Sequence, residues 1–274
     1  MTDKTDMLSE AGQEAIIEAL KQENEHLKRQ IAMAVNLRFH LMPNVYPAFP
    51  DAEGMDIYAD QIGLAGVGGD FFDFFRIDAD HIGIVIADIF DGGDAAALYM
   101  VAFKLYLMGE LNMGFSPSEI IGVVNNRLAR ANEDNLCLTA WYGVYEISTG
   151  KITAVNAGHE APVIYRKDGS VEQLDGNLSY LLAVMEGMHF ESYEFTLEPG
   201  ESLILYTDGV VGAKNENGVF FDIETIKNTL SEYHDKNARD IVGQLQESLF
   251  LHIKDEPLRD DASFLCLKRK ESLH

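Results

Sequence analysis

Four acidic positions stand out because each follows an apolar run or adjoins a glycine turn, where a carboxylate is costly unless something binds it. They are Asp70, Asp88, Asp208 and the pair Asp260-Asp261. Carboxylate oxygens are the ligands that hard cations such as Mg²⁺ and Mn²⁺ prefer, and no cluster of His or Cys ligands accompanies them. We therefore expect acids from distant segments to bind divalent cations. Two such cations could activate a water for attack on a phosphoester.

The N-terminal part of the chain is expected to form one helix from about Ser9 to Leu41, which Pro43 ends. Its heptad a and d positions are, in order, Ile17, Leu20, Asn24, Leu27, Ile31, Ala34, Arg38 and Leu41. An Asn at one a position favours a parallel dimeric coiled coil, and the alternative is a single helix packed on its own domain. We expect residues 1–45 to be a helical dimerisation and linker segment, and residues 46–274 to be the domain that holds the acids.

From residue 55 onward, short strands and paired helices are expected. The expected strands are 56–61, 71–77, 81–88, 139–146, 151–156, 161–166, 192–197, 202–206 and 262–268, and the expected helices are 95–113, 117–132, 222–232 and 238–252. Ser116 and Glu119 form a capping box for the second of these helices. Because hairpins dominate and helices come in pairs, the pattern predicts an α+β fold with antiparallel sheets covered by helices.

Composition excludes several classes of protein. The chain has 274 residues, of which 47% are hydrophobic, enough for one large domain plus an extension or for two small domains. Its 21 Lys and Arg against 45 Asp and Glu give a formal charge of −24, which argues against binding nucleic acid. No signal peptide and no apolar run of roughly 18 residues are present, so we expect no membrane span. Two cysteines in apolar stretches, Cys137 and Cys266, are expected to be reduced thiols of a cytoplasmic protein.

Six short blocks occur in an order that resembles the bacterial protein phosphatase 2C-like enzymes of the sporulation stage II protein E family. They are Val67-Gly68-Gly69-Asp70-Phe71-Phe72-Asp73, Val85-Ile86-Ala87-Asp88, Ala95-Ala96-Ala97-Leu98-Tyr99-Met100, Asn156-Ala157-Gly158-His159, Leu205-Tyr206-Thr207-Asp208-Gly209-Val210 and Arg259-Asp260-Asp261-Ala262-Ser263. The resemblance spans residues 55–268. It implies a layered α-β-β-α sandwich of antiparallel sheets, preceded by the coiled-coil helix, and metal-dependent hydrolysis of phosphoserine or phosphothreonine in proteins.

The same resemblance implies a role for each acid. Asp88 would bridge two Mn²⁺ or Mg²⁺ ions, and Asp70 would bind one of them. Asp208 and Asp260 would bind the other, with Asp261 as the alternative to Asp260. The backbone carbonyl of Ile89 would add a ligand. Catalysis would proceed through a metal-activated water held by Asp70, Asp88 and Asp208.

Two further residues of the blocks have expected roles that are structural. Asp73 is expected to brace the glycine turn, and His159 to support the sheet rather than to act as a general acid. The expected partners are a phosphorylated anti-sigma-factor antagonist as substrate, an upstream regulatory protein, and a second copy of the chain.

The chain departs from the family's pattern at two places. Asp91 stands where glycine is usual, with Asp94 close behind it, and residues 179–184 replace a Pro-Leu-Gly element of a flap-like loop. These departures support one alternative, a non-catalytic interaction module that keeps the phosphatase fold.

Overall fold

The computed structural model describes residues 10–63, 69–90, 93–111, 114–133, 135–174, 179–231 and 236–271. Its helices are α1 (Glu10–Leu41), α2 (Gly93–Glu110), α3 (Pro117–Arg130), α4 (Asp208–Val211), α5 (Ile223–Ser231) and α6 (Ala238–Ile253). Its strands are β1 (Met55–Ile62), β2 (Phe71–Arg76), β3 (His81–Phe90), β4 (Cys137–Glu146), β5 (Lys151–Ala157), β6 (Val163–Tyr165), β7 (Val171–Gln173), β8 (Tyr193–Thr196), β9 (Ser202–Tyr206) and β10 (Ala262–Arg269).

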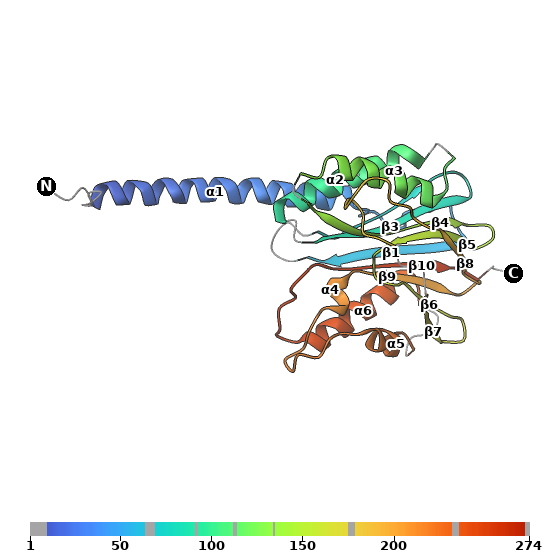
Figure 1. Cartoon of the computed structure of the whole chain (residues 1–274). Helices are drawn as coiled ribbons and strands as arrows, with labels where there is room; N and C mark the ends of the chain where they lie inside the picture. The colour runs from blue at the N-terminus through green and yellow to red at the C-terminus, as the bar shows by residue number, and fades with distance from the viewer. Residues whose placement is uncertain are drawn as a thin grey trace.

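Two five-stranded sheets lie face to face between two layers of helices, as Figure 1 shows. The strand order of the first sheet is β1-β10-β9-β6-β7, and that of the second is β2-β3-β4-β5-β8. All of these strand pairs are antiparallel. Helices α2 and α3 cover the second sheet, and α5 and α6 cover the first. The predicted α-β-β-α sandwich is therefore confirmed.

The protein has two hydrophobic cores among its described residues, and alternate side chains of a single strand pack into each of them. In β9, Leu203 and Leu205 belong to the core that fills the space between the sheets, whereas Ile204 and Tyr206 belong to the core beneath α5 and α6. Successive side chains of a strand point to opposite faces, so one apolar strand serves both cores. This explains why β9 and β10 are almost entirely buried rather than alternately polar.

The elements depart from expectation mainly at their ends. Ser116 caps α3 with the predicted capping box, but α2 ends at Glu110, before the expected residue 113. The sequence pattern missed β7 and α4, which have three and four residues and are too short to show a periodicity. Among the helices of the described residues, none has both the length and the apolar character that a membrane span requires.

Helix α1 extends away from the sandwich and meets it only near its C-terminal end (Figure 1). Ile17, Leu20 and Leu27 of the predicted seam are about half exposed. The side chains of Ile31, Ala34 and Arg38 lie outside the described residues. The exposed seam is compatible with the predicted coiled coil, which stays a prediction.

Lys104 of α2 joins the end of α1 to the second sheet. Its Nζ donates a hydrogen bond to the carbonyl of Leu41 and forms an ion pair of 2.8 Å with Asp73 of β2. The Asp73 residue is 6% exposed, and burial raises the pKa of its carboxyl in spite of Lys104. Asp73 thus braces the junction of α1, α2 and β2, which differs from the glycine turn that we expected it to brace.

Lys104→Met should lower the free energy of unfolding by about 3 kcal/mol, because it leaves a buried carboxylate without its cation. Lys227→Met is the matched control, since Lys227 pairs with the exposed Glu224 and should contribute at most about 0.5 kcal/mol. Urea unfolding followed by circular dichroism measures both. Equal losses in the two variants would contradict the bracing role of Lys104.

Candidate metal centre

The predicted ligands lie at strand ends that meet at one end of the sandwich. Asp70 precedes β2, Asp88 lies near the end of β3, Asp208 begins α4 just after β9, and Asp260 and Asp261 precede β10. Strand register pairs these ends within each sheet. Phe71 stands opposite Ala87, and Tyr206 opposite Phe264. Each sheet therefore contributes two of the acidic segments.

Asp70 links the two sheets. Its Oδ2 accepts hydrogen bonds from Thr207 Oγ1 at 2.7 Å and from Ser263 Oγ at 2.6 Å. The two donors are themselves joined, because Ser263 N–H donates to Thr207 Oγ1 at 3.0 Å. A carboxylate from the second sheet is thus fixed by two hydroxyls of the first, which orients its other oxygen.

Two glycines let the acidic segments approach closely. A Cβ added to Gly69 would clash with the carbonyl oxygen of Ile89 and lie 2.9 Å from Asp88 Oδ1. A Cβ added to Gly209 would clash with the carbonyl oxygen of Asp261. Any larger residue would separate the turns that carry the acids, so glycine is required for packing at both positions.

The carboxylates raise one another's pKa. Burial and then the charge of Asp88 raise the pKa of Asp70 well above its usual value. Burial, followed by the charges of Asp208 and Asp260, raises the pKa of Asp88 to about 7. Burial and Asp260 also raise the pKa of Asp208. In the absence of bound cations this cluster is therefore strained electrostatically, and positive charge would relieve the strain.

Unsatisfied oxygens indicate that the cluster suits a cation. Within the described residues, Oδ1 of each of Asp70, Asp88 and Asp208 is buried without a hydrogen-bond partner. Buried polar atoms normally have a partner, and these three have the chemistry of Mg²⁺ or Mn²⁺ ligands. The side chains do not form a finished coordination sphere, because no group of three or more His, Cys, Asp or Glu residues in the described ranges is close enough to hold an ion.

The two members of the aspartate pair have different surroundings. Asp261 is buried, and its Oδ2 accepts a hydrogen bond from Gln61 Nε2 at 3.1 Å. Asp260 is exposed, and its charge raises the pKa of both Asp88 and Asp208. This arrangement favours Asp260 as the member that faces the proposed cations and Asp261 as a residue that supports the turn.

His159 lies beneath the cluster rather than in it. It is 3% exposed, its Nδ1 is 2.9 Å from Thr139 Oγ1, and its backbone exchanges two hydrogen bonds with the side chain of Asn156. Thr139 stands opposite Asp88 in the register of β3 and β4. Burial lowers the pKa of His159 to about 3, so the ring is neutral near pH 7 and is a poor general acid. This geometry agrees with the predicted supporting role.

Some of the residues singled out in the sequence cannot be placed. Gly68 and Asp91 lie outside the described residues, as does the side chain of Asp94.

Sequence reasoning missed the hydroxyl donors Thr207 and Ser263 and the amide donor Gln61 as residues that hold the acids. Thr207 and Ser263 lie inside two of the six blocks, one residue before Asp208 and two residues after Asp261, so polar residues close to the acids were a usable signal. Gln61 gave no such signal, because it lies on β1, 200 residues before its partner.

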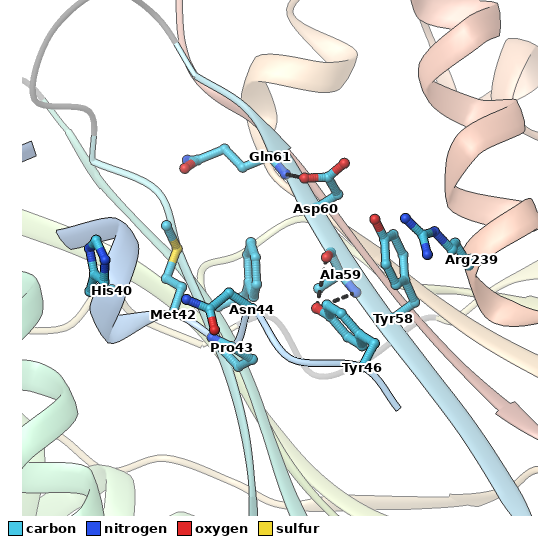
Figure 2. A pocket seen from close by; sticks show the side chains of 11 residues that line it. His40, Met42, Pro43, Asn44, Tyr46, Tyr58, Ala59, Asp60, Gln61 and Arg239 are labelled. Carbon is cyan, nitrogen blue, oxygen red and sulfur yellow. Dashed lines mark hydrogen bonds between the residues drawn. The ribbon is translucent and has the colours of Figure 1, made fainter. Parts of the chain in front are cut away.

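A pocket of about 350 Å³ lies beside the cluster, between the end of α1, β1 and α6 (Figure 2). Gln61, which bonds to Asp261, forms part of its wall. Figure 2 shows Arg239 extending from α6 toward Tyr58, with its guanidinium carbon 5.3 Å from the centre of the ring. Residues at the end of α1 and Gln61, the hydrogen-bond donor to Asp261, therefore line the same pocket.

Gly209→Ala should destabilise the protein by about 1–3 kcal/mol and weaken Mn²⁺ binding, because the new methyl group pushes the Asp208 turn away from Asp261. Gly243→Ala on α6 is the control, since no atom of the described residues lies within 4 Å of the added Cβ. Thermal unfolding with and without Mn²⁺ measures both effects. An unchanged Mn²⁺-induced shift in Gly209→Ala would contradict the requirement for close approach.

Comparison with protein families and curated proteins agrees with this geometry. The family model described as "Stage II sporulation protein E (SpoIIE)" matches residues 78–270. The phosphoserine phosphatase RsbU of Bacillus subtilis is 28% identical over 248 residues, which are 90% of this chain and 72% of that protein. Protein IcfG of Synechocystis is 27% identical over 81% of this chain, but this chain spans only 39% of IcfG.

Solved structures show the same fold. The PP2C domain of SiaA from Pseudomonas aeruginosa has a TM-score of 0.73 at 20% identity, covering 92% of this chain and 98% of that one. A structure of SpoIIE from Bacillus subtilis with its PP2C phosphatase domain has a TM-score of 0.68 at 16% identity, covering 78% and 63%. Because the family model covers more than half of the chain and the fold agrees, the chain belongs to the stage II sporulation protein E family of PP2C-like protein serine/threonine phosphatases.

Proposed function

We propose that this chain hydrolyses phosphoserine or phosphothreonine in a protein substrate with two divalent cations, Mn²⁺ or Mg²⁺. The proposed ligands are the carboxylates of Asp70, Asp88, Asp208 and Asp260 and the carbonyl of Ile89. The observation that carries the proposal is the set of three buried carboxylate oxygens that have no hydrogen-bond partner among the described residues, contributed by both sheets at one end of the sandwich. A structure of RsbX, 18% identical with a TM-score of 0.59, was solved in complex with magnesium, which is compatible with such ligands.

The cations, when bound, would supply Lewis acidity and an activated water for attack on the phosphorus atom. The protein's own residues supply geometry. Thr207 and Ser263 orient Asp70, and the glycines at 69 and 209 allow the turns to meet. Asp88 interacts electrostatically with Asp70 and also with Asp208 and Asp260. The electrostatic strain among the acids is released when positive charge binds, so these residues favour the loaded state.

The proposed substrate is a phosphorylated anti-sigma-factor antagonist in a partner-switching pathway of the cytoplasm. Two relatives that this chain resembles, RsbU and RsbP of Bacillus subtilis, are named phosphoserine phosphatases. Another solved relative contains RsbU and RsbW domains in one Mycobacterium tuberculosis protein, and this chain covers 61% of it. The formal charge of −24 opposes the approach of an anionic phosphoprotein, and bound cations would offset that repulsion at the centre.

Regulation is proposed to act through α1. The exposed seam of α1 would pair with a second copy of the chain, and an upstream regulatory protein would alter that pairing. Lys104 provides the physical connection, because it contacts both the last residue of α1 and Asp73, three residues after Asp70.

With Mn²⁺, the purified protein should hydrolyse p-nitrophenyl phosphate, and Asp88→Asn should abolish the activity. The same substitution should raise the melting temperature of the metal-free protein, because it removes a buried charge that its neighbours repel. Spectrophotometric rates and thermal unfolding measure the two effects. Equal rates in both proteins would refute metal catalysis through Asp88.

The absence of divalent-cation binding by calorimetry up to millimolar concentrations would favour the non-catalytic alternative.

Leu20→Lys combined with Leu27→Lys should convert a dimer into a monomer, because both positions lie on the proposed seam. Met33→Lys is the control, since Met33 is 72% exposed but lies off the a and d positions. Sedimentation equilibrium measures the mass of each protein. A dimer that survives the double substitution would refute pairing through this seam.

A further inference from the structure

A loop beside the proposed metal centre presents apolar side chains to solvent. Tyr180, Val184 and Met185 are 66%, 54% and 57% exposed. They belong to residues 179–187, which we call the clamped loop. Single exposed apolar residues are common on proteins, whereas exposed apolar residues gathered on one short segment are a feature of binding surfaces.

Strand pairing places the clamped loop close to the metal ligands. Leu182 forms an antiparallel bridge with Leu138 of β4, and Leu138 stands opposite Ile89 of β3. Neighbouring strands lie about 4.8 Å apart, so the backbone at Leu182 is about 10 Å from that of Ile89. Phe90, which is 40% exposed, is two residues beyond Asp88 and therefore on the same face of β3. Apolar surface thus adjoins the cluster of acids.

Asparagine side chains from α3 and its C-terminal end hold the loop in one conformation. Asn125, which is fully buried, accepts a hydrogen bond from Ala183 N–H at 3.0 Å and donates one to the carbonyl of Met185 at 2.9 Å. Asn132 donates to the carbonyl of Ala183 at 2.9 Å. Asn126 accepts from the N–H of Gly187 at 2.7 Å.

The conformation that these amides hold is strained. Ala183 has a φ of 68°, a left-handed value that is uncommon for a residue with a Cβ and persists only when its surroundings enforce it. An ion pair of 2.6 Å between Arg130 and Glu186 fixes the loop from the side as well. Because the loop is already ordered, a partner that binds it loses little affinity to ordering.

We propose that the clamped loop and Phe90 form the docking surface for the phosphoprotein substrate, which would present an apolar patch next to its phosphorylated residue. This inference rests on the proposed function. The occupant follows from continuity with the metal centre, because a protein is large enough to place a phosphoryl group in the cluster and to contact the loop about 10 Å away. A small phosphate ester does not extend across the roughly 10 Å between them. The clamped loop therefore distinguishes protein substrates from small esters.

The test replaces exposed apolar side chains with neutral polar ones, so that charge does not change. In Val184→Ser combined with Met185→Gln, the ratio of kcat/KM for a serine-phosphorylated anti-sigma-factor antagonist to kcat/KM for p-nitrophenyl phosphate should fall about tenfold. Leu251→Gln is the matched control, because Leu251 is 70% exposed on α6, in the opposite helical layer, and should leave the ratio unchanged. Tyr180→Ser should lower the ratio independently.

Each outcome decides the matter. An unchanged ratio in the double variant overturns the inference, and so does an equal loss toward both substrates, which would make the loop a support of the metal centre. If the wild-type protein hydrolyses neither substrate with Mn²⁺, the proposed function fails on its own. Calorimetric titration of the same phosphoprotein then tests docking separately: weaker binding to the double variant supports it, and equal binding overturns it.

Discussion

Repulsion among carboxylates is the constraint on which the rest of this end of the molecule depends. Acids from two sheets lie close enough to raise one another's pKa, and one oxygen on each of three of them is buried without a partner among the described residues. Such a cluster persists only if packing elsewhere forces the segments together. Two hydroxyls on Asp70 and two glycines at the contact points provide the local part of that force.

The sandwich provides the larger part. Strands β9 and β10 bury apolar side chains on both faces, so the sheet that carries Asp208 and Asp260 cannot move without exposing one of two cores. Residues 71–74 of β2 and most of β3 are buried in the same way on the other side. The hydrophobic layers therefore stabilise a polar centre that the acids alone would open.

The sequence predicted most of this fold because its signals were periodic. The hairpin of β2 and β3, the capping box at Ser116 and the long α1 all depend on local patterns that one segment carries by itself. The acids were recognisable because a charged residue at the end of an apolar strand is unusual. Short elements such as β7 and α4 carry no measurable period. The observed ends of the strands differ from the expected ends by one to a few residues.

Long-range contacts are what the sequence could not supply. Thr207 and Ser263 become partners of Asp70 only when the sheets stack, and the bond between Gln61 and Asp261 spans 200 residues. Asp73 was expected to act locally, yet its partner Lys104 comes from a different helix. The asparagines that hold residues 179–187 belong to α3 and the turn after it, and nothing in their local sequence shows that the loop packs against them.

The unpaired oxygens of the acidic cluster also bear on how such a protein changes over generations. Many substitutions that remove one of these acids relieve repulsion, so the folded chain tolerates their loss better than it tolerates a damaged core. Under selection for stability alone, random substitutions would remove the acids while the hydrophobic cores of the sandwich stayed intact. The two glycines and the two hydroxyls serve folding as well, but folding alone does not explain the mutually repelling acids.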